Sequence, residues 1–91
     1  MGYKLITTPE TENDIDKAVE WYVNICKPVA KRFLTELHAA KRYIHKNPEK
    51  IAKKYDNVRV AFLKKFPYGL HYTFNNNTII IVALFHTSEN P

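Results

Sequence analysis

The hydrophobic pattern of this 91-residue chain changes its period at Asn47-Pro48. Between Pro9 and that point the apolar residues recur every three or four positions, which is typical of amphipathic helices. After it they alternate or form a continuous run, which is typical of strands. The residue before a proline disfavours the helical conformation, so a helix is expected to end at Asn47. Helices followed by a run of strands favour an α+β fold.

The first predicted helix begins at Thr8-Pro9 and runs to about Cys26. Threonine caps helices, proline suits their first position, and acidic residues in the first turn complement the helix dipole. The apolar face of this helix consists of Ile15, Ala18, Val19, Tyr22, Ile25 and Cys26. Because Cys26 ends that face, it is expected to be a small buried core residue.

A second helix follows almost at once, because Pro28 breaks the first. Its apolar stripe consists of Ala30, Phe33, Leu34, Leu37, Ala40 and Ile44. So short a connection predicts that the two helices form an antiparallel hairpin.

Four strands are predicted around this hairpin. Tyr3–Thr7 is rich in aromatic and β-branched residues and precedes the helices. Val58–Phe66 alternates after them, and Leu70–Phe74 follows a turn signal. Thr78–Phe85 is a continuous apolar run, which suggests a strand buried on both faces. The expected order is β-α-α-β-β-β, a helical hairpin packed on a mostly antiparallel four-stranded sheet.

Length and charge limit the function further. Residues 1–91 suit one small domain, and the net charge of +5 favours an anionic partner, either nucleic acid or an acidic protein segment. Residues 10–26 are mostly acidic and residues 27–46 mostly basic, so they either attract each other or form two solvated faces. No apolar run could cross a membrane, and the single cysteine cannot form an internal disulfide. We therefore expect a cytoplasmic protein.

Motifs for nucleotides or metals are missing from the sequence. There is no Walker loop, no GxGxxG, no HExxH and no cysteine–histidine metal pattern, so neither a cofactor nor a metal is expected. The strand half instead interleaves cations with aromatic residues such as Tyr55, Phe62 and Phe66. Cations hold phosphates and rings stack on bases, which would suit RNA. Alternatively, the rings fill the core and the lysines are merely solvated.

Taken together and in order, several segments resemble the RelE/ParE superfamily. They are DIDKAVEWY, RFLTEL, a KNP helix end, VRVAFLKKFPYGLHY and the closing FHTSENP. This family comprises toxins of bacterial type II toxin–antitoxin modules, often called plasmid stabilisation proteins. The resemblance implies the fold described above and a cognate antitoxin that wraps the toxin. RelE-like members cleave messenger RNA in the ribosome, whereas ParE-like members block DNA gyrase without catalysing a reaction. Whether this chain is an enzyme stays open.

The RelE branch implies specific residues. Attack of a 2′-hydroxyl on the adjacent phosphate needs a proton acceptor, a proton donor and cations against the developing charge. Carried over by position, Arg59 and Lys65 are the candidate phosphate-binding cations and His86 is the candidate acid or base. The further candidates for contact with RNA or another target are Lys53, Lys54, Lys64, Tyr68, His71 and Tyr72.

One position departs from the family pattern. Many relatives have an arginine shortly after the final histidine, where this chain has Glu89. A carboxylate beside an RNA phosphate is repulsive. The departure fits a gyrase-type toxin, an inactive member that acts only as an antitoxin-binding co-repressor module, or a substitution made so that the protein could be expressed. It also leaves the ribonuclease as an alternative to be tested.

Overall fold

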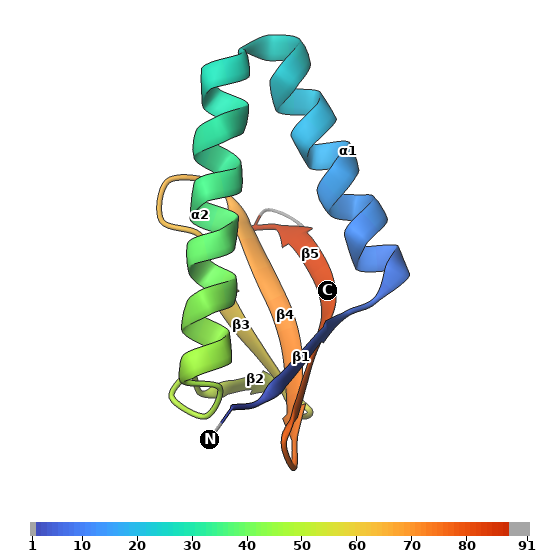
Figure 1. The fold of residues 1–91 in the computed structure, drawn as a ribbon, viewed down its shortest axis with the longest axis vertical. Helices are drawn as coiled ribbons and strands as arrows, with labels where there is room; N and C mark the ends of the chain where they lie inside the picture. Colours follow the sequence, from blue (N-terminus) through green and yellow to red (C-terminus); the bar gives the residue numbers. More distant parts are fainter. Residues whose placement is uncertain (1, 88–91) are drawn as a thin grey trace.

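The computed structural model describes residues 2–87, and it places two helices on one face of a five-stranded sheet (Figure 1). The elements in chain order are β1 (Lys4–Thr7), α1 (Pro9–Ile25), α2 (Lys27–Lys46), β2 (Lys53–Tyr55), β3 (Val58–Phe62), β4 (Tyr68–Asn75) and β5 (Thr78–His86). The sheet order is β1-β5-β4-β3-β2, with β1 parallel to β5 and every other pair antiparallel. The predicted α+β architecture and helical hairpin are confirmed.

The number of strands was predicted wrongly, because β2 was missed. Its three residues are all exposed and show no apolar alternation, so the sequence contains no signal for a strand there. β2 pairs with only two residues of β3, Val58 and Arg59. β3 itself ends at Phe62 instead of Phe66, and a short loop then leads into β4.

The start of α1 follows the predicted capping pattern. The hydroxyl of Thr8 accepts a hydrogen bond from the amide of Thr11 at 3.2 Å, and Pro9 occupies the first turn. The hydroxyl of Thr11 in turn donates to the carbonyl of Ile81 at 3.4 Å. The capping residues therefore also attach the start of α1 to β5.

The connection between the helices is a single residue, Cys26. Its amide donates to the carbonyl of Tyr22, closing α1, and α2 begins at Lys27. Figure 1 shows that the joined ends of the two helices extend past the sheet. Cys26 is consequently exposed, and the prediction that it lies in the core was wrong.

The core lies between the hairpin and the sheet. Its fully buried large side chains include Phe33, Leu37 and Ile44 of α2 and Leu70, Tyr72, Ile79 and Ile81 of the two central strands. Four aromatic rings close one end of this core, and the centroids of the contacting rings are 5.2–6.4 Å apart. They belong to Tyr22, Phe33, Phe66 and Tyr68. These rings hold the β3–β4 loop against both helices.

The central strand β5 is buried on one face only, contrary to the prediction of burial on both. Ile79 and Ile81 face the helices, and the next buried residue is Leu84. The pairing with β4 shifts by one residue between His71 and Tyr72, which inserts an extra residue in β5 and changes the phase of the alternation. The side of the sheet without helices is called the open face below. The side chains that β5 places on it are only partly buried.

Candidate functional site

Arg59 supports a loop from its place on β3. It lies opposite Tyr72 of β4, and its Nη1 donates to the carbonyls of Ile51 at 2.6 Å and Glu49 at 3.1 Å. Beside it the hydroxyl of Tyr72 donates to the carbonyl of Pro48 at 2.8 Å. Both side chains thus hold the segment between α2 and β2. Tyr72 is completely buried, and burial raises the pKa of its phenol.

His86 and Lys65 lie at the other end of the sheet. His86 pairs with Tyr68 across β4 and β5, and the two rings meet edge to face at 5.2 Å. The backbone amide of Lys65 donates to a carboxylate oxygen of Glu36 at 2.9 Å, which ties the β3–β4 loop to α2. The two predicted residues therefore share the end of the sheet at which β3 and β4 are joined.

Two of the three predicted catalytic residues, Arg59 and His86, lie at different levels of the sheet. Arg59 lies opposite Tyr72 of β4. His86 lies opposite Tyr68, which is four residues before Tyr72 on the same strand. Four residues of a strand span roughly 13 Å. Their backbones are therefore well separated along the sheet, and the Arg59 guanidinium bonds the carbonyls of Glu49 and Ile51 instead of His86.

Another histidine, His71, lies on the open face. Nδ1 of His71 shares a 3.0 Å hydrogen bond with the hydroxyl of Tyr55, and its ring packs edge-on against Phe85 at 4.8 Å. The side chain is 5% exposed, and burial, with a further contribution from the charge of Lys54, lowers the pKa of His71. A neutral imidazole held in this way is poorly suited to attract a phosphate.

The remaining predicted cations lie around the outer edge of the sheet. Lys53 and Lys54 are exposed on β2, and Lys64 is exposed just after β3. The ammonium of Lys54 lies 5.7 Å from the centroid of the Phe62 ring, within range of a cation–π interaction. These exposed lysines stay predicted contacts for an anionic partner, and Lys64 also lines a groove on the protein surface.

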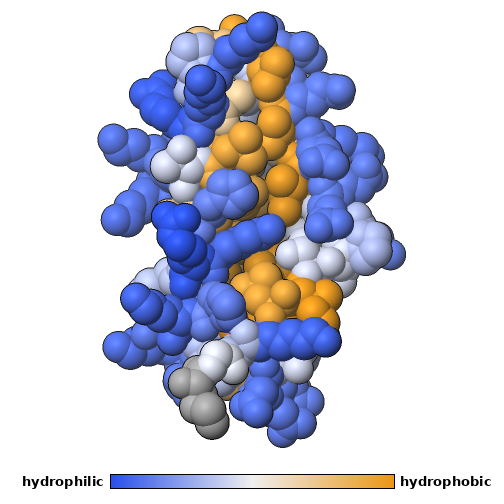
Figure 2. All heavy atoms as spheres, viewed as in Figure 1, coloured by the Kyte–Doolittle hydropathy of each residue, from blue (hydrophilic) through white to orange (hydrophobic). Residues whose placement is uncertain are grey.

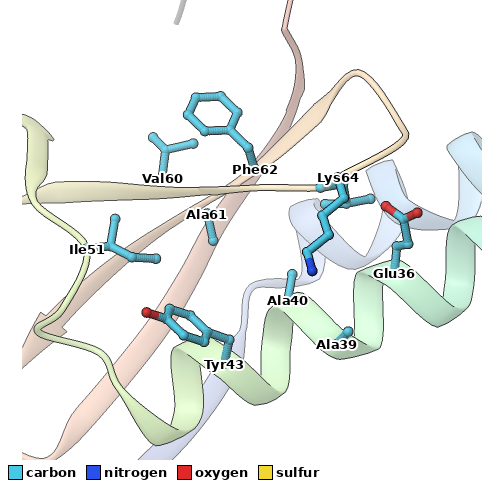
Figure 3. A pocket seen from close by; sticks show the side chains of 10 residues that line it. Glu36, Ala39, Ala40, Tyr43, Ile51, Val60, Ala61, Phe62 and Lys64 are labelled. Atoms are coloured by element: carbon cyan, nitrogen blue, oxygen red, sulfur yellow. The ribbon is translucent and has the colours of Figure 1, made fainter.

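That groove lies between α2 and β3 and has a volume of about 550 Å³ (Figure 3). Its lining is mainly apolar and includes Ala39, Ala40, Tyr43, Ile51, Ala61 and Phe62. Figure 3 shows Ala61 pointing towards α2 and Phe62 pointing to the other side of β3. Lys64 extends from beyond the end of β3 towards Ala40 of α2. A pocket of this kind suits apolar side chains of a partner, and its charged lining residues are Glu36 and Lys64.

Sequence reasoning did not single out the groove. Tyr43 and Phe62 are both large and exposed, yet neither belongs to a predicted apolar stripe that could have marked a surface. The available signal was the aromatic Tyr43 directly before the buried Ile44, at the margin of the α2 stripe. Only the three-dimensional fold shows that this edge of the α2 stripe lies beside β3.

More apolar surface is exposed on the helical side. Figure 2 shows a hydrophobic strip running lengthwise between flanking hydrophilic side chains. At the joined ends of the helices, Trp21 and Ile25 are each 61% exposed. Exposed apolar surface beyond isolated residues is typical of a protein that binds another.

Comparison with known proteins gives the family. A family model described as the ParE toxin of the type II toxin–antitoxin system parDE matches residues 5–91. This chain belongs to the ParE toxin family. A solved structure of the chromosomal ParDE toxin–antitoxin system from P. aeruginosa aligns with a TM-score of 0.80 at 17% identity, covering 92% of this chain and 95% of that one. That likeness shows a shared fold. No curated protein sequence matches this chain.

Other kinds of site find little support in this ParE-family chain. Within residues 2–87, no three histidine, cysteine, aspartate or glutamate side chains are grouped so that they could hold a metal ion. Neither helix of that same stretch combines the length and the apolar character that a membrane crossing requires. Glu89, which departs from the family pattern, lies outside the described residues.

Proposed function

We propose that this ParE-family chain arrests bacterial growth in the cytoplasm by binding DNA gyrase, without catalysing a reaction, and that a cognate antitoxin neutralises it. The family description supports the toxin and its antitoxin partner. The gyrase target is the finer part of the proposal. It rests on the arrangement of the residues that an RNA-cleaving relative would need.

The observation that carries the proposal is the position of Arg59. Its guanidinium donates to two loop carbonyls, and it is level with Tyr72, roughly 13 Å along the sheet from the level of His86. Catalysis of phosphoryl transfer depends on cations held against the developing charge. With its arginine engaged elsewhere, the predicted set lacks that arrangement, and the sequence has Glu89 where the family pattern has a cation.

Two assays on the purified chain distinguish the targets. In a supercoiling assay with purified gyrase, we expect the chain to inhibit introduction of supercoils in proportion to its concentration. In toeprinting on translating ribosomes, we expect no new messenger RNA ends. Cleavage at defined codons with unaffected supercoiling would replace the gyrase proposal with the ribonuclease.

The ribonuclease remains the second candidate because of one observation. Tyr68 and His86 are in ring contact at the end of the sheet where Lys65 also lies. A smaller site made of Tyr68, His86 and Lys65 would not need Arg59. If it operates, His86→Ala abolishes cleavage in the toeprinting assay, whereas the exposed His38→Ala leaves it unchanged.

The inactive co-repressor module predicts a different outcome. Such a chain binds the antitoxin but arrests nothing, even after Glu89→Arg restores the cation of the family pattern. Growth curves of induced cells carrying the natural or the Glu89→Arg sequence separate this alternative from both toxin mechanisms.

A further inference from the structure

α2 carries two pairs of cations on one exposed side. Lys27 and Lys31 lie one turn apart near the joined ends of the helices, and Arg42 and Lys46 lie one turn apart at the other end. At about 100° per residue, the four positions fall within roughly 100° of arc around the helix axis. We call these four residues the α2 ridge. They form one basic surface along the length of the helix.

No acid of α2 balances this ridge. The helix has a single acidic residue, Glu36, and it lies on a different side, where it lines the groove beside β3. A carboxylate oxygen of Glu36 accepts a hydrogen bond from the amide of Lys65 at 2.9 Å. The charge of Glu36 is therefore directed to the β3–β4 loop and away from the ridge.

The other helix has the opposite charge. Within residues 2–87, no ion pair joins the acids of α1 to the cations of α2, so the two helices form separate charged faces. A polyanion is repelled by α1 and attracted by α2, which orients its approach. The exposed acids of α1 are Glu10, Glu12, Asp14, Asp16 and Glu20.

We propose that the α2 ridge binds the phosphate backbone of duplex DNA, with one cation pair on each side of the major groove. This inference rests on the proposed function, since the duplex is the DNA on which gyrase acts. Lys31 and Arg42 are about 16 Å apart along the helix axis at 1.5 Å per residue. The major groove of B-form DNA is about 12 Å wide and admits a helix. Long, flexible side chains cover the difference.

The chemistry of the ridge favours DNA over an acidic protein or a membrane. Protein interfaces depend on apolar and aromatic anchors, and every ridge residue is a cation. Protein–DNA interfaces are more polar and far more positively charged. Binding to a membrane surface would require the apolar face of α2. That face is packed on the sheet, with Phe33, Leu37 and Ile44 at most 1% exposed.

The shape of the ridge favours DNA over duplex RNA. The ridge is the outward side of an exposed helix, and α2 extends past the sheet at its joined end (Figure 1). The deep, narrow major groove of A-form RNA does not admit such a surface. Contacts to phosphates position a protein without reading bases, so we expect binding that is independent of DNA sequence.

Fluorescence anisotropy of a labelled 20-base-pair DNA duplex measures binding by the purified natural chain. With four phosphate contacts, the logarithm of the association constant should fall against the logarithm of salt concentration with a slope of about −3.6. Affinity then falls about 150-fold between 50 and 200 mM salt. A slope near zero, or no binding at 50 mM salt, would overturn the inference.

Two double variants with equal net charge locate the contact. Lys31→Gln with Arg42→Gln removes one cation from each pair, and Lys4→Gln with Lys17→Gln removes two exposed lysines from β1 and α1. We expect the ridge variant to bind at least about tenfold more weakly at 50 mM salt, with its slope reduced to about −1.8. The control should stay within about twofold of the natural chain. Equal weakening of both would show that net charge alone is responsible and would contradict the ridge.

Competitors separate DNA from the other polyanions. We expect unlabelled duplex DNA to displace the probe at a lower charge concentration than polyglutamate or an RNA duplex of the same length and sequence. Polyglutamate that competes equally well would assign the ridge to an acidic protein instead. RNA that competes equally well would remove the argument from groove shape and overturn the assignment to DNA.

The supercoiling assay separates this inference from the proposed function. The ridge variant should need at least about tenfold more protein than the control variant to inhibit gyrase, and equal inhibition would exclude a role for the ridge. Inhibition by a natural chain that binds no DNA would overturn the inference alone. DNA binding that depends on the ridge, with gyrase unaffected, would count against the proposed function alone.

Discussion

Gly69 is a position in β4 where any side chain would collide with its neighbours. A Cβ there would lie 2.7 Å from Cγ1 of Val60 and 3.2 Å from the nearest ring atom of Phe62. Valine is β-branched and has little freedom to turn away. We expect Gly69→Ala to lower the free energy of unfolding by about 1–3 kcal/mol, the usual range for overpacking, as measured by urea denaturation.

The other described glycine provides a matched control. No atom lies within 4 Å of a Cβ at Gly2, so Gly2→Ala should leave the urea midpoint unchanged. Adding Val60→Ala to Gly69→Ala should recover part of the loss, because it removes the colliding methyl group. Strict additivity of the two substitutions would show that the close approach to Val60 is not the cause.

His71 should make stability depend on pH. Burial and the charge of Lys54 lower its pKa below the ordinary 6.5, so the unfolded chain takes up this proton at higher pH than the folded one does. The free energy of unfolding should therefore fall as the pH drops below 6.5 and be fully retained above it. Urea denaturation between pH 7.5 and pH 5 should show a shallower fall for His71→Gln than for the natural chain. An equal fall in both proteins, with His38→Gln as the exposed control, would exclude this role.

At the scale of single residues, the structure adds contacts that the sequence could not reveal. Arg59 and Tyr72, which stay predicted contacts for a target, both bond backbone carbonyls of the loop after α2. Nothing in a linear pattern indicates where that loop crosses the sheet. The partnership of Tyr55 with His71 depends on β2, which the sequence did not reveal.

At the scale of elements, α1 depends on its N-terminal cap. The Thr8 hydroxyl accepts from the Thr11 amide and also shares a hydrogen bond with the Thr11 hydroxyl, which reaches β5. Thr8→Ala should cost about 1 kcal/mol of unfolding free energy, and Thr8→Ser, which keeps the hydroxyl, much less. Thermal or urea denaturation of the three proteins compares them. Similar losses in both variants would shift the explanation from the cap to the threonine methyl group.

The loop between α2 and β2 depends on Tyr72 in a comparable way. Tyr72→Phe leaves the Pro48 carbonyl without its donor and should cost about 1–3 kcal/mol. Since Tyr72 is fully buried, growth arrest at low temperature should persist in this variant. Loss of arrest in a variant shown by circular dichroism to be folded would restore Tyr72 as a contact residue.

Long, strongly periodic elements were predictable, and short or phase-shifted ones were not. The helical hairpin follows from 3.6-residue periodicity, the cap at Thr8 and the break at Pro28. β5 was predicted to be buried on both faces because a run of apolar residues conceals which of them alternate. The extra residue opposite His71 and Tyr72 then moves Leu84 into the core, and no local pattern marks such a shift.

At the scale of the whole molecule, the fold separates a covered face from surfaces that remain available. The helices shield one side of the sheet, while the groove beside β3 and the strip in Figure 2 leave apolar surface exposed. Small domains with such surfaces gain stability from a bound partner. The net charge of +5 and the lysines around the outer edge favour an acidic one. Composition alone predicted an anionic partner, either nucleic acid or an acidic protein segment, but the location of the surface required the packing of α2 against β3.

The most direct measurement of the central claim is plasmid topology in cells that express this chain alone. After induction, growth should stop and the plasmid should lose negative supercoiling on agarose gels containing an intercalator. Co-expression of the neighbouring antitoxin gene should restore both. Arrest with normal plasmid supercoiling, accompanied by messenger RNA cut at defined codons, would contradict the account.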